Sequence, residues 1–189
     1  MTRSVTAHLF SSVNGVNESP HLFQFDAFGQ EEGAAMGKAL EGVTDVVMGR
    51  KLWAEWSTYW PGNSGDGFGE FINPVRKHVI SSTLRGDVGW NSIVIEDDPI
   101  EYVQALAASE GGGITVAGGI ETVRSLFLGG VIDTLTLTMH PAATGEGPVS
   151  YTHLRAHETV LDIVCRLVLE KKKYIHLPAF SPYNYYFTP

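Results

Sequence analysis

Short apolar runs alternate with stretches of helical periodicity over most of the chain. Apolar, β-branched runs predict strands at Val5–Phe10, Asp45–Gly49, His78–Ser82, Ser92–Glu96, Ile114–Ala117 and Ile132–His140. Apolar positions at helical spacing predict helices over Glu31–Leu40, Arg50–Trp56 and Pro99–Ser109, and from Glu121 onward. Gly62–Gly69 is predicted to be a glycine-rich loop. Strands that alternate with helices at short intervals predict an α/β fold with a largely parallel sheet covered by helices.

The stretch Ile114–Gly130 combines a buried strand, a double glycine and the start of a helix. Gly118 and Gly119 carry no Cβ, so a ligand can approach the backbone closely where the chain leaves the strand. The first turn of the helix directs its N–H groups and its dipole at that position, where phosphate is the usual ligand. A tight strand-to-helix connection explains the same glycines equally well, and the Rossmann pattern G-x-G-x-x-G is absent. This feature alone leaves both interpretations open.

Two further predicted strand ends carry small or basic groups. Gly49–Lys51 follows the second strand, and Ser81–Thr83 ends the third. In open α/β sheets, ligands bind at the carboxyl ends of the strands. Arginine offers a planar cation for phosphate, lysine a point charge, and the hydroxyl side chains offer hydrogen-bond donors. Together with the double glycine, these ends predict a nucleotide with several phosphates as the ligand.

Composition narrows the class of protein. The 189 residues have a net charge of -8, 43% hydrophobic residues and one cysteine. The length predicts one domain, and the negative charge argues against nucleic acid or an anionic membrane as the partner. No apolar run is long enough to span a bilayer. A single cysteine excludes an internal disulfide and a zinc site built from cysteines, and we expect no metal. We therefore expect a cytoplasmic protein that acts on a small molecule.

Five motifs occur in the order in which a known family carries them. They are Ser-Ser-Val-Asn-Gly, Val-Val-Met-Gly-Arg-Lys-Leu-Trp, Lys-His-Val-Ile-Ser-Ser-Thr-Leu, Ile-Thr-Val-Ala-Gly-Gly, and the run from Gly-Gly-Val-Ile-Asp to Thr-Gly-Glu-Gly. Over Arg3–Pro148 the chain resembles the dihydrofolate reductase superfamily, in the branch related to the reductase domain of bacterial riboflavin biosynthesis. The zinc deaminase motifs of bifunctional members, His-x-Glu and Pro-Cys-x-x-Cys, are absent.

The resemblance implies a dihydrofolate-reductase-like, three-layer α/β fold with a mixed, mostly parallel sheet, and NADPH as the cofactor. It implies hydride transfer to a small heterocyclic or ribosylaminopyrimidine-like substrate, as in 5-amino-6-(5-phosphoribosylamino)uracil reductases. By motif match, it also implies which residues lie near the cofactor. These are Gly49, Arg50 and Lys51 for phosphate; Ser81, Ser82 and Thr83 for the ribose 2′-phosphate; Gly118, Gly119, Ile120 and Glu121 for the pyrophosphate; and Ser12 and Gly15 for the nicotinamide and substrate.

The end of the chain differs from the rest. All 21 glycines precede Val149. Val149–Lys173 resembles one translated reading frame of a sequencing adapter and does not resemble the family. We therefore predict a truncated reductase domain at residues 1–148 and a non-native tail at residues 149–189, in which the strands that close the family's sheet are replaced.

The proton donor and the class of activity stay open at the level of sequence. Asp26 is the carboxylate candidate, since flanking aromatic residues could raise its pKa. An aspartate that caps a turn, with water as the proton donor, is the alternative. Trp53, Trp56, Tyr59 and Trp60 form an aromatic cluster that belongs to the core or lines the substrate pocket. Two other readings of the fold are a redox-silent nucleotide-binding protein and a module that forms a homodimer.

Overall fold

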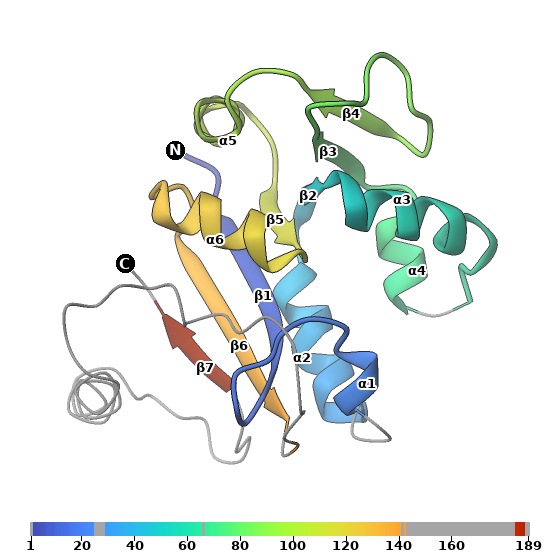
Figure 1. Ribbon diagram of the computed structural model, residues 1–189, viewed down its shortest axis with the longest axis vertical. Coiled ribbons are helices and arrows are strands. Elements are labelled where there is room, and N and C mark those ends of the chain that lie inside the picture. Colours follow the sequence, from blue (N-terminus) through green and yellow to red (C-terminus); the bar gives the residue numbers. More distant parts are fainter. Residues whose placement is uncertain (1, 25–28, 66, 141, 143–183, 188–189) are drawn as a thin grey trace.

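The structure, a computed structural model, describes residues 2–24, 29–65, 67–140, 142 and 184–187. Its centre is a seven-stranded sheet with the strand order β4-β3-β2-β5-β1-β6-β7 (Figure 1). The strands are β1 (Val5–Ser12), β2 (Val43–Gly49), β3 (Arg76–Ile80), β4 (Ser92–Ile95), β5 (Gly113–Ala117), β6 (Thr134–His140) and β7 (Asn184–Phe187). The helices are α1 (His21–Gln24), α2 (Gln30–Leu40), α3 (Arg50–Tyr59), η2 (Trp60–Gly62, a 3-10 helix), α4 (Gly67–Ile72), α5 (Pro99–Ala108) and α6 (Ile120–Leu128).

The predicted α/β fold with a mixed, mostly parallel sheet is confirmed. β1 to β6 run parallel to one another, and β7 alone pairs antiparallel, with β6. One difference lies in Gly62–Gly69, which was predicted to be a loop, because α4 begins at Gly67. Phe68 of α4 packs edge-on against Trp56 and Trp60, with ring centroids 5.4 and 5.0 Å apart. This aromatic packing stabilises a helix that its glycines disfavour.

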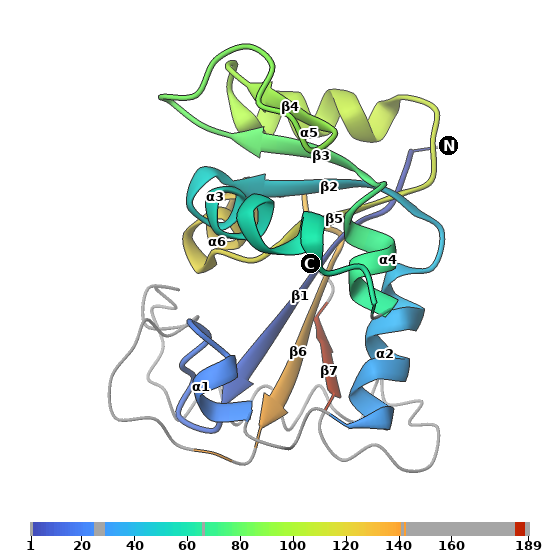
Figure 2. The same ribbon diagram turned by 90° about the vertical axis from the view of Figure 1, so that its right-hand side faces the viewer.

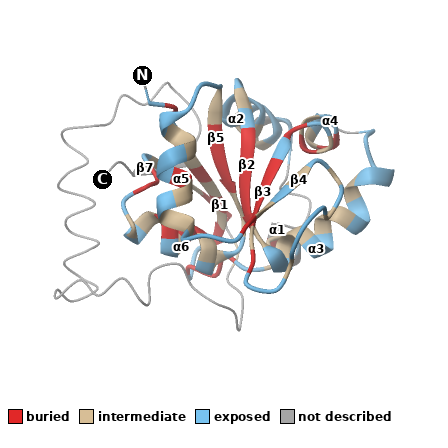
Figure 3. Ribbon diagram, turned by 90° about the horizontal axis from the view of Figure 1, so that it is seen from above, coloured by how far each residue is buried: buried red, intermediate tan, exposed pale blue. Residues whose placement is uncertain are grey.

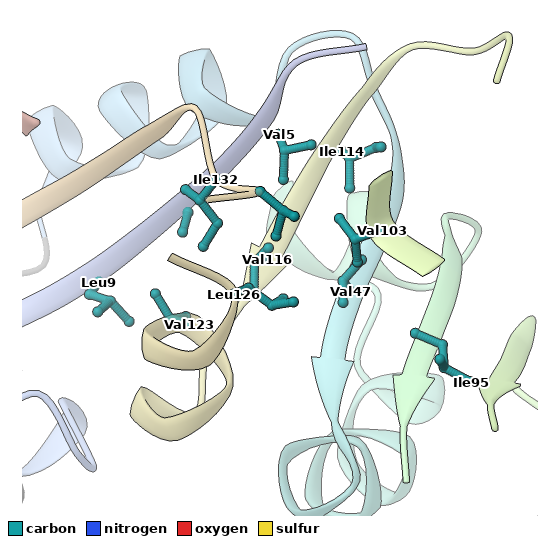
Figure 4. Packing of buried hydrophobic residues seen from close by; sticks show 12 residues of the cluster. Val5, Leu9, Val47, Ile95, Val103, Ile114, Val116, Val123, Leu126 and Ile132 are labelled. Carbon is teal, nitrogen blue, oxygen red and sulfur yellow. The ribbon is translucent and has the colours of Figure 1, made fainter. Parts of the chain in front are cut away.

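Each face of the sheet buries its own apolar cluster. On one face, α5 and α6 pack on β1, β2 and β5, with Val47, Val116 and Leu126 among the buried residues (Figure 4). On the other face, α3 and α4 pack on β2 and β3 around Val46 and Met48. Val46 and Val47 are both 0% exposed although adjacent, because successive side chains of a strand point to opposite faces. Figure 3 shows this burial concentrated in the central strands, with exposed residues on the outer sides of the helices.

The edge strand β7 comes from residues that the sequence assigned to the tail. Asn184–Phe187 pairs with Leu135–Thr138 of β6. Its Tyr-Tyr-Phe run has high strand propensity, which fits a short edge strand. The sequence predicted that the strands closing the family's sheet are replaced, and in this structure a four-residue segment of the tail range occupies that edge. Asp26 and the adapter-like residues 149–173 lie outside the described residues.

A buried polar network joins the amino-terminal part of the sheet to α5. Asp45, on β2, accepts hydrogen bonds from Arg3 Nη2 and from Thr44 Oγ1, the latter at 2.7 Å. The other oxygen of Asp45 lies 2.8 Å from His78 Nε2, and His78 Nδ1 lies 2.9 Å from the hydroxyl of Tyr102. Because the Asp45 carboxylate only accepts when ionised, His78 Nε2 donates to it, and Nδ1 accepts from Tyr102. This pattern fixes one tautomer of the imidazole.

The pKa values of this network follow from burial and pairing. Burial alone would raise the pKa of Asp45, but hydrogen bonds from His78, Thr44 and Arg3 and the Arg3 charge hold it below 3.8. Burial lowers the pKa of His78, and the nearby Asp45 carboxylate opposes that shift only in part. Asp45 is therefore charged and His78 neutral near pH 7.

Candidate functional site

The carboxyl ends of β2 and β5 form the topological switch point of the sheet. β2 and β5 are neighbours, with Met48 opposite Ala117. The helix after β2, α3, packs on one face, and the helix after β5, α6, packs on the other. In open α/β sheets ligands bind outside the carboxyl ends of the strands at such a switch point, and we refer to this place, outside the ends of β2 and β5, as the β2–β5 crevice. The views in Figures 1 and 2 show the two helices leaving adjacent strand ends on opposite sides.

Glycines let the two helix starts approach closely. A Cβ on Gly49 would lie 2.7 Å from Thr122 Oγ1 of α6, and a Cβ on Gly118 would lie 2.7 Å from Leu52 Cδ2 of α3. Gly118 and Gly119 have φ values of 42° and 73°, in the region that favours glycine. Each turn therefore contacts the first turns of the other strand's helix, and side chains larger than hydrogen do not fit at Gly49 and Gly118 without displacement.

The first turns of α3 and α6 carry no side-chain cap. Their N-cap residues are Gly49 and Gly119, which lack a side chain that accepts a hydrogen bond. In contrast, Asp98 caps α5 by accepting hydrogen bonds from the backbone N–H groups of Ile100 and Glu101, at 2.9 and 3.1 Å. Uncapped helix N-termini retain donors and a positive dipole end for an anion. Two such termini meet at the β2–β5 crevice.

Charged side chains border the crevice. Arg50 and Lys51, in the first turn of α3, are exposed, and no hydrogen bond or ion pair within the described residues engages either of them. Glu121, in the first turn of α6, is exposed as well. Because its carboxylate is negatively charged, the backbone N–H of Glu121, and not its side chain, would hold a ligand phosphate. An exposed guanidinium and ammonium without protein partners can bind phosphate at no loss of an existing ion pair.

The structure divides Ser81–Thr83 between two roles. Ser81 Oγ accepts hydrogen bonds from the backbone N–H groups of Thr83 and Leu84, at 3.1 and 2.9 Å, and its side chain is buried. Its hydroxyl therefore holds the turn after β3. Ser82 and Thr83 are exposed, and Thr83 Oγ1 also lies 3.5 Å from Ser81 Oγ. β3 is the next strand after β2, with Ile80 opposite Gly49, so this turn lies beside the crevice.

Ser12 and Gly15 meet in a tight turn at the end of β1. Gly15 N–H donates to the Ser12 carbonyl at 2.9 Å, and Gly15 has a φ of 84°. Ser12 Oγ accepts from Val16 N–H at 2.9 Å, and Ser12 is fully buried. Ser12 lies opposite His140 of β6. It is four residues beyond His8, which is the last residue of β1 that pairs with β5. At about 3.3 Å per residue, this places it about 13 Å beyond the end of β5.

Two histidines, His8 on β1 and His140 on β6, lie near the ring of Phe10. The His8 ring lies 5.0 Å from the Phe10 ring, and the Phe10 ring lies 5.6 Å from that of His140. His140 also packs on Phe23 of α1, with centroids 5.8 Å apart. Burial lowers the pKa of His8 to about 4, and burial also lowers the pKa of His140. Both imidazoles are therefore neutral near pH 7.

The aromatic cluster belongs mainly to the core. Trp53, Trp56 and Trp60 pack against the cluster around Val46 and Met48, and Trp53 Nε1 donates to Ser92 Oγ at 2.9 Å.

Within the described ranges, no group of three or more histidine, cysteine or acidic side chains is placed to hold a metal ion. No helix in that part of the chain has the length and apolar content needed to cross a membrane.

The fold defines the class of protein, and solved structures share it. A putative riboflavin biosynthesis protein from Shewanella sp. PV-4 aligns at a TM-score of 0.58 with 16% identity, over 81% of this chain and 85% of that chain. A pyrimidine reductase-like protein from Corynebacterium diphtheriae aligns at 0.53 with 17% identity, over 83% of each chain. Dihydrofolate reductase from Enterococcus faecalis, complexed with NADP(H), aligns at 0.50 with 17% identity, over 79% and 78%. The fold is therefore that of the dihydrofolate-reductase-like proteins.

Sequence comparison gives the family. The model of the RibD C-terminal domain matches residues 3–173, and the chain belongs to this family. The match runs past Pro148, where the sequence predicted the reductase domain to end. The uncharacterized protein YyaP of Bacillus subtilis (strain 168) is 27% identical in an alignment of 112 positions that covers 57% of this chain and 59% of that protein. The chain thus spans about three fifths of the length of this relative.

Proposed function

We propose that the protein is an NADPH-dependent reductase that transfers hydride to a small heterocycle, with a ribosylaminopyrimidine as the first candidate substrate. The observation that carries this proposal is the β2–β5 crevice, where two uncapped helix N-termini meet between glycines. Membership of the RibD C-terminal domain family supports a reductase. The NADP(H) complex of the Enterococcus faecalis enzyme supports this cofactor for the fold.

The residues at the crevice fit a dinucleotide. The N–H groups of Ile120 and Glu121, after Gly118 and Gly119, would hold the pyrophosphate, and Arg50 would add a planar cation. The hydroxyl groups of Ser82 and Thr83 would donate hydrogen bonds to the ribose 2′-phosphate. When bound, NADPH supplies the hydride.

The turn at Ser12 and Gly15 would border the nicotinamide and the substrate. Because the Ser12 hydroxyl is fully engaged within the turn, its role there is to fix the backbone. Asp26 remains the proposed proton donor, with water as the alternative. The protein thus binds and orients both reactants, and the reactive electrons come from the cofactor.

Calorimetric titration with NADPH tests the cofactor assignment. Replacing Arg50 by alanine removes one charge-assisted contact of about 1.5–3 kcal/mol, so we expect NADPH affinity to fall by about tenfold or more. Lys38→Ala is the matched control, since Lys38 is an exposed cation in the last turn of α2, away from the crevice. Gly119→Val should weaken NADPH binding as well, because a side chain would enter the turn. If both crevice variants bind NADPH like the wild-type protein, the cofactor assignment is wrong.

Turnover separates a reductase from its redox-silent alternative. The assay follows loss of reduced nicotinamide absorbance with 5-amino-6-(5-phosphoribosylamino)uracil. Tight NADPH binding without turnover of this and related heterocycles would favour a nucleotide-binding protein that has lost catalysis. Sedimentation of the protein tests the second alternative, a module that forms a homodimer.

We also propose that residues 1–148 form the reductase domain and residues 149–189 a non-native tail in a cytoplasmic protein. The abrupt loss of glycine after residue 148 supports this boundary. Peptide mapping of the protein isolated from its native source should then yield no peptide from the adapter-like residues 149–173. Recovery of such a peptide would overturn the boundary.

A further inference from the structure

We infer that His8 binds the substrate, through a hydrogen bond between its Nδ1 atom and a neutral edge of a planar heterocycle. This inference rests on the proposed reductase function and adds a residue that determines which substrate fits. His8 lies opposite Ala117 and is the last residue of β1 that pairs with β5. Gly118 and Gly119 follow Ala117 directly, so His8 lies beside the crevice. Beyond His8, β1 continues to Ser12 with β6 as its partner.

The hydrogen bonds of the imidazole are only half satisfied. His8 Nε2 lies 2.7 Å from Thr138 Oγ1 on β6. His8 Nδ1 is buried and has no hydrogen-bond partner among the residues that the structure describes. A buried polar atom without a partner is destabilising, and such atoms are rare enough in folded proteins that each calls for a functional or structural reason. Leucine or phenylalanine would fill this position without that penalty, which indicates that the imidazole serves something other than packing.

A second atom of this kind lies at the same end of β1. Asn17 follows the Ser12–Gly15 turn and is 6% exposed, and its Nδ2 atom has no partner within the described part of the chain. The assignment of nitrogen and oxygen in an amide rests on the hydrogen-bond network. Among the described residues, Ser11 Oγ is the one partner of this amide, 3.5 Å from Oδ1, so either assignment leaves one amide atom without a partner there. Asn17 is thus a second buried polar side chain without a full set of partners, in the segment that follows β1.

The protonation state of the His8 imidazole determines which chemical groups of a ligand can pair with it. Burial lowers the pKa of His8 to about 4, so the imidazole is neutral at physiological pH. A phosphate or carboxylate partner would favour the protonated form, whereas a ring N–H or C=O pairs with the neutral one. The Thr138 hydroxyl can donate or accept, so either tautomer of His8 is allowed and Nδ1 can serve as acceptor or donor. Uracil-like rings present both kinds of group on one edge.

A side-chain movement would have to expose Nδ1 to the ligand. The His8 side chain as a whole is partly exposed, although Nδ1 itself is covered. Side-chain shifts are common when ligands bind. The Phe10 ring, tilted by 37° and centred 5.0 Å away, flanks the imidazole and gives an apolar surface for the face of a planar ligand.

Two substitutions at His8 separate this role from a structural one. In His8→Asn the amide reaches the position of Nδ1 and loses the Thr138 contact. In His8→Gln the amide reaches the position of Nε2 and keeps that contact, while Nδ1 is lost. The measurement is calorimetric titration of the protein–NADP+ complex with 5-amino-6-(5-phosphoribosylamino)uracil, because the oxidised cofactor prevents turnover. NADP+ affinity and the melting temperature are measured for every variant.

We expect His8→Gln to weaken binding of the pyrimidine by about tenfold or more, with NADP+ affinity unchanged. We expect His8→Asn to bind the pyrimidine within about threefold of the wild-type protein, despite the lost Thr138 contact. Equal binding by His8→Gln and wild type would overturn the inference, as would absence of pyrimidine binding by the wild-type NADP+ complex. Joint loss of stability and of both ligands in the two variants would assign His8 a structural role. Failure of the wild-type protein to bind NADP+ would instead refute the reductase proposal itself.

Discussion

The buried network around Asp45 allows one quantitative test of the fold. Arg3 and Asp45 have side chains that are 5% and 10% exposed. Replacing Asp45 by asparagine keeps the volume but removes the charge that balances Arg3. Asparagine also places an N–H₂ group next to donors from Arg3 or His78. Breaking a buried ion pair by removing one partner costs about 3–5 kcal/mol, because the other charge stays buried and unpaired.

That loss is large against a typical stability of about 5–15 kcal/mol. For a chain of this size, each kcal/mol lowers the melting temperature by about 2–4 °C, so Asp45→Asn should melt about 10 °C lower. Thermal and urea unfolding at pH 7, followed by circular dichroism, measure this change. Asp97→Asn is the control, because Asp97 is exposed and should change the free energy of unfolding by about 0.5 kcal/mol or less.

The pH dependence gives the same test a second signature. The pKa of Asp45 is lower in the folded protein than its usual 3.8. Its stabilising contribution is therefore complete above that value and is lost as the pH falls through the folded pKa. The difference in unfolding free energy between wild type and Asp45→Asn should be full at pH 7 and shrink below about pH 4. A variant within about 1 kcal/mol of wild type at pH 7 would refute the reasoning that this pair is tightly coupled.

Further outcomes follow from other contacts. Tyr102→Phe leaves His78 Nδ1 without its donor, and urea unfolding should show a loss of about 1 kcal/mol. Gly118→Ala places a Cβ against Leu52 at a φ of 42°, and unfolding free energy should fall by about 1–3 kcal/mol; an unchanged value would mean that the turn relaxes freely. Because the pKa of His8 drops from 6.5 to about 4 on folding, stability should decline as the pH falls from 6.5 to about 4, by about 3 kcal/mol in total. The His8→Asn protein should lack that portion of the decline.

Much of the fold follows from local patterns, and the exceptions have physical reasons. The alternation of strands and helices is encoded by periodicity within each segment, so it was predictable. α4 was missed because Gly67 and Gly69 favour a loop, while contacts of Phe68 with distant tryptophans stabilise a helix. Gly69 is needed there, because a Cβ would lie 2.3 Å from the Asn63 carbonyl oxygen. Such contacts between separate segments are not visible in a local pattern.

Part of the candidate site was likewise predictable from local sequence patterns, and part was not. The glycines after β2 and β5 were found because their chemistry is local to each turn. That Gly49 contacts Thr122 and Gly118 contacts Leu52 depends on the strand order, which sequence periodicity does not specify. That His8 Nδ1 is buried without a partner among the described residues is visible only in the assembled sheet.

The position of β5 has a consequence for how the chain is made. β1 pairs with β5 and β6, and Val5 is aligned with Ile114, which is translated more than a hundred residues later. During synthesis, β2, β3 and β4 can assemble while β1 still has neither of these neighbours. The ribosome must therefore deliver β5 before the two parts of the sheet can join, and until then the apolar face of β1 is a target for chaperones or for other nascent chains.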